Sequence, residues 1–134
     1  METLDVATVS RAQLVDITAA VAALVGRLAL RSGAVHVFVP HTTAGVTINE
    51  NADPSVKSDL LMALEALVPP GLAFTHSEGN SDAHLRASLI GSSVTVPVRD
   101  GILQLGTWQG IYFAEFDGPR RRRLHVQPLG LGAS

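Results

Sequence analysis

Three histidines, His41, His76 and His84, stand among polar residues that are suited to chemistry. An imidazole takes up or releases a proton near neutral pH, and its neutral form is a common metal ligand. His41 follows a proline at the expected end of a strand, where a rigid scaffold presents reactive groups. The other two, His36 and His125, lie inside predicted strands, and we expect them to have structural roles.

The densest polar segment spans residues 76–84 and contains two histidines, two acids, an asparagine and two serines, but no lysine. Together with His41, its imidazoles would form a three-histidine site with a position open for water or substrate, as in zinc enzymes. The spacing of His76 and His84 matches no standard zinc motif. The alternatives are that an acid here holds the second ring nitrogen of a ligating histidine, or that the segment is a surface loop whose polar groups bind one another.

Polar side chains flank the predicted strand over residues 45–49 on both sides. Thr42 and Thr43 precede it, and their hydroxyls can bind phosphate or orient the neighbouring imidazole, although threonines in a turn also cap the backbone. Glu50 follows it and is suited to act as an acid, a base or a metal ligand. The next asparagine and aspartate are typical of a turn and a helix cap.

The only basic run is Arg120–Arg123. In an extended segment alternate side chains point to opposite faces, so at most two of these arginines share a face. A solvated edge with ion pairs is the simpler interpretation, and a phosphate-binding role is the alternative. The single tryptophan, Trp108, lies near this run between two glycines, and it either stacks on a ligand or fills the core.

Hydrophobic spacing predicts two main helices among a larger number of strands. The apolar stripe from Ile17 to Leu28 predicts the first helix, and the stripe from Val56 to Val68 predicts the second, which Asp53 would cap. A shorter helix is predicted over residues 82–90, and a loosely ordered tail over residues 128–134. We expect strands over residues 3–10, 34–39, 45–49, 93–98, 102–105, 111–116 and 123–127, with a hairpin turn at Asp100-Gly101.

This order of elements predicts a single domain, residues 1–134, of the α+β class: a small, mostly antiparallel, β-sandwich-like fold. A chain of 134 residues can bury a sufficient core without disulfides. It has no cysteine, which excludes disulfides, thiolate metal sites and a cysteine nucleophile.

Composition also limits the partners. The net charge of −2 gives no general attraction to nucleic acid. No apolar stretch is long enough to cross a bilayer, and acids stand where a signal peptide carries basic residues, so we expect a cytoplasmic protein that does not bind membranes. Charged residues make up only 16% of the chain, which favours an oligomer that covers part of its surface.

Three segments resemble the signatures of the YjbQ family, also named the secondary thiamine-phosphate synthase family. They are HTTAGVTINENADP over residues 41–54, HSEGNSDAH over residues 76–84, and GTWQGIYF over residues 106–113 with EFDGPR over residues 115–120. The resemblance extends from about the first strand to His125. Three long motifs in the same order are far more specific than the spacing of the histidines.

The resemblance implies a small α+β sandwich-like fold, a homotrimer, and a polar site near the subunit interface. It also implies a weak thiamine-phosphate synthase activity, which joins an aminopyrimidine diphosphate to a thiazole phosphate and releases pyrophosphate. With the chemistry above, it points to His41, His76 and His84 as ligands of one divalent metal, to Glu50 and Asp82 as general base or partners of the ligands, and to Thr42, Thr43, Asn80 and Arg120 as substrate-binding residues.

The implied reaction and the histidines favour different metals. A diphosphate leaving group usually needs magnesium held by carboxylates and water, whereas three imidazoles prefer zinc or a similar transition metal. We expect a divalent metal, zinc before magnesium. The histidines suit a metal-activated water equally well. A metal-dependent hydrolase of a small phosphorylated metabolite is therefore the alternative, and a non-catalytic protein that binds a small anionic ligand is the third interpretation.

Overall fold

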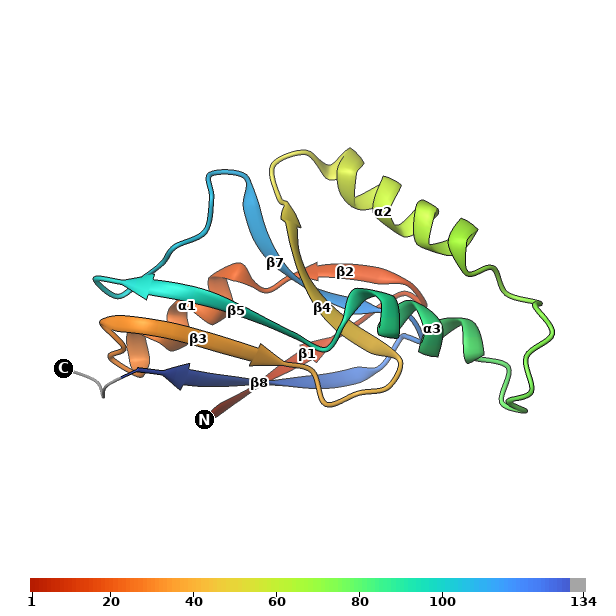
Figure 1. Cartoon of the computed structure of the whole chain (residues 1–134), viewed down its shortest axis with the longest axis horizontal. Coiled ribbons are helices and arrows are strands. Elements are labelled where there is room, and N and C mark those ends of the chain that lie inside the picture. Colours follow the sequence, from red (N-terminus) through yellow and green to blue (C-terminus); the bar gives the residue numbers. More distant parts are fainter. Residues whose placement is uncertain (131–134) are drawn as a thin grey trace.

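Two antiparallel sheets and three helices make up the described part of the chain, residues 1–130, in this computed structural model (Figure 1). In chain order the elements are β1 (Glu2–Ala7), β2 (Gln13–Asp16), α1 (Thr18–Arg27), β3 (Ser32–Phe38), β4 (Ala44–Glu50), α2 (Pro54–Leu67), α3 (Ser81–Ile90), β5 (Ser93–Arg99), β6 (Ile102–Leu103), β7 (Gln109–Glu115) and β8 (Arg121–Leu129). The predicted α+β class is confirmed. None of the three helices is long and apolar enough to span a membrane.

The larger sheet has the strand order β1-β8-β3-β5-β6, and the smaller sheet has the order β2-β7-β4. All neighbouring strands in residues 1–130 run antiparallel. The predicted hairpin joins β5 to β6, with Val98 opposite Leu103. Its turn residues, Asp100 and Gly101, have φ angles of 53° and 75°, which is the backbone that a two-residue hairpin turn requires.

Two predicted segments are corrected at the edges of the sheets. The first strand ends at Ala7 instead of continuing to Ser10, and the unpredicted β2 follows, because four residues are too few to show a clear alternation. The tail predicted from residue 128 is wrong at its start, since Pro128 and Leu129 pair with β3. Residues 131–134 of that tail lie outside the described residues.

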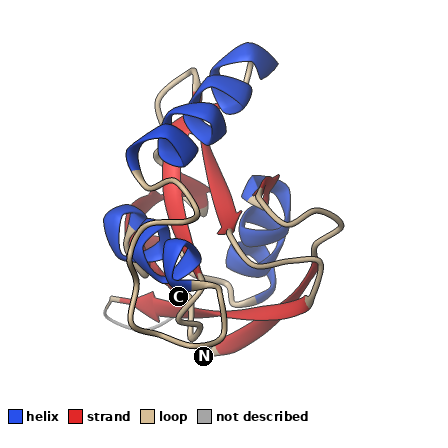
Figure 2. Ribbon diagram, turned by 90° about the vertical axis from the view of Figure 1, so that its right-hand side faces the viewer, coloured by secondary structure: helices blue, strands red, loops and turns tan. Residues whose placement is uncertain are grey.

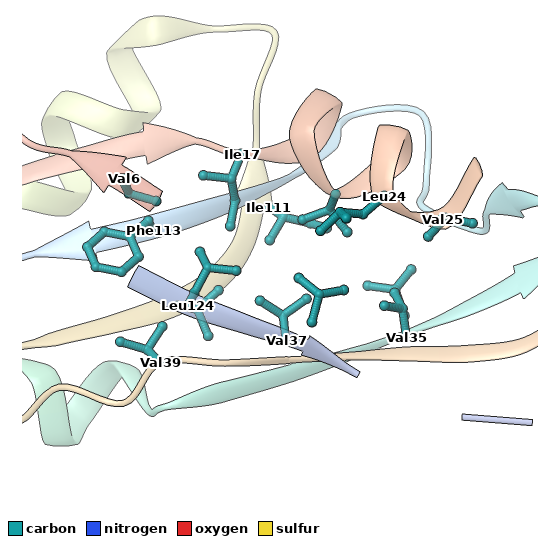
Figure 3. Close-up of a cluster of buried hydrophobic side chains, with 14 of the residues drawn as sticks. Val6, Ile17, Leu24, Val25, Val35, Val37, Val39, Ile111, Phe113 and Leu124 are labelled. Atoms are coloured by element: carbon teal, nitrogen blue, oxygen red, sulfur yellow. The ribbon is translucent and has the colours of Figure 1, made fainter. Parts of the chain in front are cut away.

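The main core lies between the sheets and is closed by α1 (Figure 3). The predicted stripe of α1 is confirmed, because Val21, Leu24 and Val25 are almost fully buried. Inward-facing side chains of β3, β7 and β8 pack against this stripe; Figure 3 labels Val35, Val37, Ile111, Phe113 and Leu124 among them. The core thus fixes the strands whose ends carry the polar motifs.

The helix α2 packs less completely than the sequence predicted, and it stands at the top of the molecule in Figure 2. Asp53 does cap it, because its Oδ1 accepts a hydrogen bond from the backbone nitrogen of Ser55 at 2.9 Å. Leu64 and Val68 are buried, whereas Leu67 is 71% exposed. The prediction of a fully buried stripe is therefore wrong, since α2 crosses mainly the edge strand β2 and extends beyond it.

Candidate functional site

The segment that follows β3 and the helix α3 border an open cavity of about 470 Å³. The segment carries His41 and Thr42, and α3, which packs against β4, carries His84. The lining consists of His41, Thr42, Ala44, His84, Ala87, Ser88, Gly91 and Ser92, and we call it the histidine–hydroxyl pocket. Two of the three predicted metal ligands therefore face one cavity.

The histidine–hydroxyl pocket combines two imidazoles with the hydroxyls of Thr42, Ser88 and Ser92, and no fully charged side chain lines it. A hydroxyl both donates and accepts hydrogen bonds, and a neutral imidazole does so through its two nitrogens. The Ser88 hydroxyl donates to the backbone oxygen of His84 at 2.9 Å, so the donors left for a ligand are the hydroxyls of Thr42 and Ser92 and the imidazole N–H groups. This set of groups is suited to bind a phosphate or another small polar anion.

Two glycines bring β4 close to the end of α3 and so shape this pocket. Gly91 ends α3, as the sequence predicted, with a φ of 97° that favours glycine. Its carbonyl oxygen accepts a hydrogen bond from the backbone nitrogen of Val46 at 3.1 Å. A Cβ atom on Gly45 would lie 2.4 Å from that oxygen, so only glycine fits there.

The His41 ring is held by the backbone of β8. Its Nε2 lies 3.0 Å from both the nitrogen and the carbonyl oxygen of Arg123, so it donates in one tautomer and accepts in the other. In either tautomer Nδ1 is the nitrogen left for a ligand. Burial lowers the pKa of His41 below 6.5, and the positive charge of Arg122 lowers this pKa further, so the ring is neutral at pH 7.

A buried ion pair between Arg122 and Glu115, which we did not predict, supports the segment that follows β3. Arg122 Nε donates to Glu115 Oε1 at 2.9 Å, and Arg122 Nη2 donates to Thr43 Oγ1 at 2.9 Å. Thr8 Oγ1 donates to Glu115 Oε1 at 2.7 Å. Burial alone would raise the pKa of Glu115, but hydrogen bonds from Arg122, Thr8 and the backbone hold this pKa below its usual value. The predicted ligand-binding residue Thr43 is therefore engaged by Arg122 and is 6% exposed.

The side chains of the basic run alternate between exposed and buried, as predicted. The buried one is Arg122, and not Arg120, which we expected to bind the substrate. Arg121 and Arg123 are exposed, whereas Arg122 is buried between the sheets. Arg120 pairs with Asp117 at 3.1 Å instead of contacting the segment after β3. The one signal in the sequence was the acid Glu115 at the end of the apolar strand β7, because a buried acid needs a partner of opposite charge.

His76 lies beside His84, with ring centroids 5.4 Å apart in an edge-to-face arrangement. Both histidines line a second cavity of about 330 Å³, so His84 takes part in both cavities. Within residues 1–130, no three His, Cys, Asp or Glu side chains are placed to hold one metal ion. The three predicted ligands thus line adjoining cavities but do not converge on one point.

Asp82, predicted to act as a base or as a partner of the ligands, is a buried acid bound by two arginines. Its carboxylate lies 3.1 Å from Arg11 Nη2 and 3.3 Å from Arg86 Nη2. Arg86 Nη2 also donates to the backbone oxygen of Val68 at 2.8 Å, which ties α3 to the end of α2. The structure therefore places Asp82 in a supporting position, with its oxygens already bound.

Asn80 and Arg120, both predicted to bind the ligand, meet at Asp117. Asn80 Nδ2 donates to Asp117 Oδ2 at 2.9 Å, and the Arg120 side chain donates to the same oxygen at 3.1 Å. Burial would raise the pKa of Asp117, but these two partners hold it below its usual value. Asn80 Oδ1 is buried and has no hydrogen-bond partner within the described residues.

Glu50 lies at the opposite end of β4 from the histidine–hydroxyl pocket. Ala44 begins the strand beside that pocket and Glu50 ends it, which separates them by about 20 Å at the usual rise per residue. Within one chain Glu50 therefore does not join the histidines, contrary to our expectation. Its Oε2 accepts a hydrogen bond from the backbone nitrogen of Ala52 at 3.0 Å.

Known proteins of one family match this chain over nearly its full length. A family model described as "UPF0047 protein YjbQ-like" matches residues 2–131. A UPF0047 protein of Methanocaldococcus jannaschii is 54% identical over 123 residues, 92% of this chain and 89% of that protein. The UPF0047 protein YugU of Bacillus subtilis is 47% identical over 131 residues, 97% of this chain and 99% of that protein. The crystal structure of a YjbQ/UPF0047 family protein from Clostridium acetobutylicum has a TM-score of 0.94 at 47% identity, and the match covers 96% of this chain and 100% of that one. As its three motifs predicted, the chain belongs to the UPF0047 family of YjbQ-like proteins.

Proposed function

We propose that this chain is an enzyme that acts on a small phosphorylated metabolite in the histidine–hydroxyl pocket. The observation that carries the proposal is the lining of one cavity by two imidazoles and three hydroxyls. Its volume of about 470 Å³ lies within the range of about 300–1,000 Å³ that small-molecule sites occupy. Hydroxyls and neutral imidazoles supply directed hydrogen bonds to phosphate oxygens, which fix the position of the substrate.

The reaction that we propose is the thiamine-phosphate synthase reaction implied by the family resemblance. The thiazole nitrogen attacks the methylene carbon of the aminopyrimidine diphosphate, the carbon–oxygen bond breaks, and its electron pair leaves with pyrophosphate. Catalysis requires the two substrates to be held in line and the departing negative charge to be stabilised. In this proposal Thr42 and Ser92 donate to the leaving phosphates, and His84 places a further donor beside them.

Hydrolysis of a phosphorylated metabolite is a second candidate function, and the protonation state of His41 favours it. This imidazole is neutral at pH 7, because burial and Arg122 lower its pKa. When Nε2 donates to the carbonyl oxygen of Arg123, Nδ1 presents a lone pair that can accept a proton from water, as a general base does.

We propose the binding of a divalent metal separately, because neither proposed reaction requires it. The three histidines do not converge, so they would have to turn toward a common point to bind one ion, and no step above depends on it. Zinc is the metal that imidazoles favour, and magnesium would suit a diphosphate. We predict bound zinc in the untreated protein, lost as the pH falls through about 6 and absent from His41→Ala, His76→Ala and His84→Ala. Retention of stoichiometric zinc by all three variants would contradict a three-histidine site.

Turnover by purified protein tests the proposed function. The two thiamine precursors are incubated with wild type and with variants, with and without chelator, and thiamine phosphate, pyrophosphate and inorganic phosphate are measured. We expect His41→Ala and His84→Ala to lower the rate by about 100-fold, within the usual range for a lost acid–base group. His36→Ala is the matched control, because its ring bonds Thr95 on the sheet, outside this pocket.

The products separate the candidate functions. Thiamine phosphate with equimolar pyrophosphate supports the synthase reaction, whereas inorganic phosphate from a single precursor supports hydrolysis. Binding of phosphate without turnover of any phosphorylated metabolite would overturn the enzyme proposal and leave the non-catalytic interpretation.

A further inference from the structure

The only tryptophan of the chain lines a separate cavity, at the end of β4 that lies away from α3 (Figure 1). Trp108 is 63% exposed, so it does not fill the core. With Ile48, Asn49, Glu50 and Gln109 it lines a shallow cavity of about 270 Å³, which we call the Trp108 cavity. A large aromatic side chain left open beside polar groups is typical of a binding surface.

Hydrogen bonds hold the backbone around the Trp108 cavity in place. The carbonyl oxygen of Trp108 accepts a hydrogen bond from the backbone nitrogen of Asn51 at 2.9 Å. Gly106 and Gln109 are joined twice: the backbone nitrogen of Gln109 donates to Gly106 O at 3.1 Å, and Gly106 N donates to Gln109 Oε1 at 2.8 Å. Glu50 stands opposite Gln109 in the β4–β7 ladder. The backbone that carries the exposed indole is therefore held by hydrogen bonds, and a ligand that binds it has little backbone to order.

The polar groups of the cavity keep unused hydrogen-bonding capacity. Glu50 Oε2 accepts from Ala52, and Glu50 Oε1 has no hydrogen-bond partner within residues 1–130. The side-chain oxygens of Asn49 and Gln109 accept from backbone nitrogens at 2.7 Å and 2.8 Å, which leaves both amide NH₂ groups as donors. The cavity thus offers one aromatic face, one anionic acceptor and two neutral donors.

We propose that the Trp108 cavity binds a planar nitrogen heterocycle that carries an amino group. Its ring would stack on the indole of Trp108, and its amino group would donate to the carboxylate of Glu50. The amides of Asn49 and Gln109 would donate to ring nitrogens or to a ring carbonyl. The negative charge and the aromatic face favour neutral or protonated rings over anionic ones. Within one chain the length of β4 separates this site from the histidine–hydroxyl pocket, and its test measures binding, without any turnover.

Because Trp108 is the only tryptophan, tryptophan fluorescence, excited selectively over that of Tyr112, reports on this cavity alone. We expect 4-aminopyrimidine and adenine to quench the emission saturably, and pyrimidine and purine, which lack the amino group, to bind about tenfold more weakly, which corresponds to about 1.4 kcal/mol. Benzoate should not bind. Glu50→Gln should remove most of the preference for the amino-substituted rings, and Trp108→Leu, followed by calorimetry, should bind none of them. Thermal unfolding checks that both variants fold.

His41→Ala is the matched control. Its fluorescence titration with the same ring compounds should equal that of the wild type, whether or not the proposed enzyme activity is found. Equal quenching by all the rings, or an unchanged preference in Glu50→Gln, would overturn the proposal. Trp108 emission that acrylamide cannot quench would also overturn it, because another copy of the chain would then cover the cavity in solution.

Discussion

His41 and the buried Glu115 beneath it both have lowered pKa values, but for different reasons. His41 has its pKa lowered and is neutral, whereas Glu115 remains ionised because Arg122 and Thr8 bind its carboxylate. A buried carboxylate without its partner would lose most of its solvation, so the pair is sensitive to the loss of either member. The Arg122 side chain holds Thr43 and the neighbouring backbone of Arg123 holds His41, so the pair anchors the segment that lines the pocket.

We predict that Arg122→Met lowers the free energy of unfolding by about 3–5 kcal/mol, because it leaves a buried charge without a partner. The double variant Arg122→Met with Glu115→Gln should lose less, since a neutral amide is cheaper to bury than a carboxylate. Urea denaturation of the wild type, both single variants and the double variant completes the cycle. Additive losses in the double variant would show that the two side chains are not energetically coupled.

The same groups predict how stability depends on pH. Both folded-state pKa values lie below their ordinary values of 6.5 for His41 and 4.5 for Glu115, so both groups stabilise the fold at higher pH. Stability should fall as the pH drops below 6.5 and fall again below 4.5, because the unfolded chain then binds protons that the folded chain does not. Urea midpoints at pH 7.5, 5.5 and 3.5 measure this, and Glu115→Gln should reduce the second loss. A midpoint independent of pH would contradict both assignments.

The residue types of the site were predictable from the sequence, but their partners were not. Polar motifs showed His41 and His84 to be functional candidates, and both line the same cavity. Alternation along the arginine run predicted that neighbouring side chains diverge, but it does not say which strand lies opposite. The pairing of Arg122 with Glu115 therefore came only from the structure.

Among the elements, the approach of β4 to the end of α3 determines the shape of the pocket. The carbonyl oxygen of Gly91 fills the space that a side chain on Gly45 would need. Because β4 is the strand between His41 and Glu50, its position also fixes how far apart the two proposed sites lie. A change at this contact should therefore affect the pocket as well as the fold.

We predict that Gly45→Ala destabilises the protein by about 1–3 kcal/mol, as overpacking of a core does, and weakens phosphate binding in the histidine–hydroxyl pocket. Gly26→Ala is the matched control, because nothing lies within 4 Å of its added Cβ in α1. That variant should be more stable by about 0.5–1 kcal/mol, the helix preference of alanine over glycine. Thermal unfolding and phosphate titration measure both. A Gly45→Ala protein as stable as the wild type would contradict the close contact.

The two main helices show what a hydrophobic pattern can and cannot predict. The stripe of α1 lies over the core between the sheets, so spacing predicted its burial correctly. The stripe of α2 has the same kind of spacing, but only Leu64 is buried within the helix. A pattern shows which face of a helix avoids water, but it does not show whether the covering surface belongs to the same chain.

At the scale of the whole molecule, the described chain leaves several large apolar side chains in contact with solvent. Met62 and Leu67 on α2 are 61% and 71% exposed, and Leu89 on α3 is 63% exposed. Charged residues make up only 16% of the sequence. Both features are expected of a subunit that covers part of its surface in an assembly, in line with the homotrimer implied by the family resemblance.

We predict a trimer at micromolar concentration, measured by light scattering as three times the chain mass of 14.1 kDa. If α2 contributes to the interface, Leu67→Glu should shift the protein to smaller species, because a charge would then be buried in apolar contact. Ala22→Glu is the matched control, since it adds the same charge at an exposed position of α1 and away from the exposed apolar residues of α2. A monomeric wild type would contradict the trimer. A trimer that resists Leu67→Glu would instead place the interface elsewhere, and the exposed leucine would then be a solvent-facing residue of each subunit.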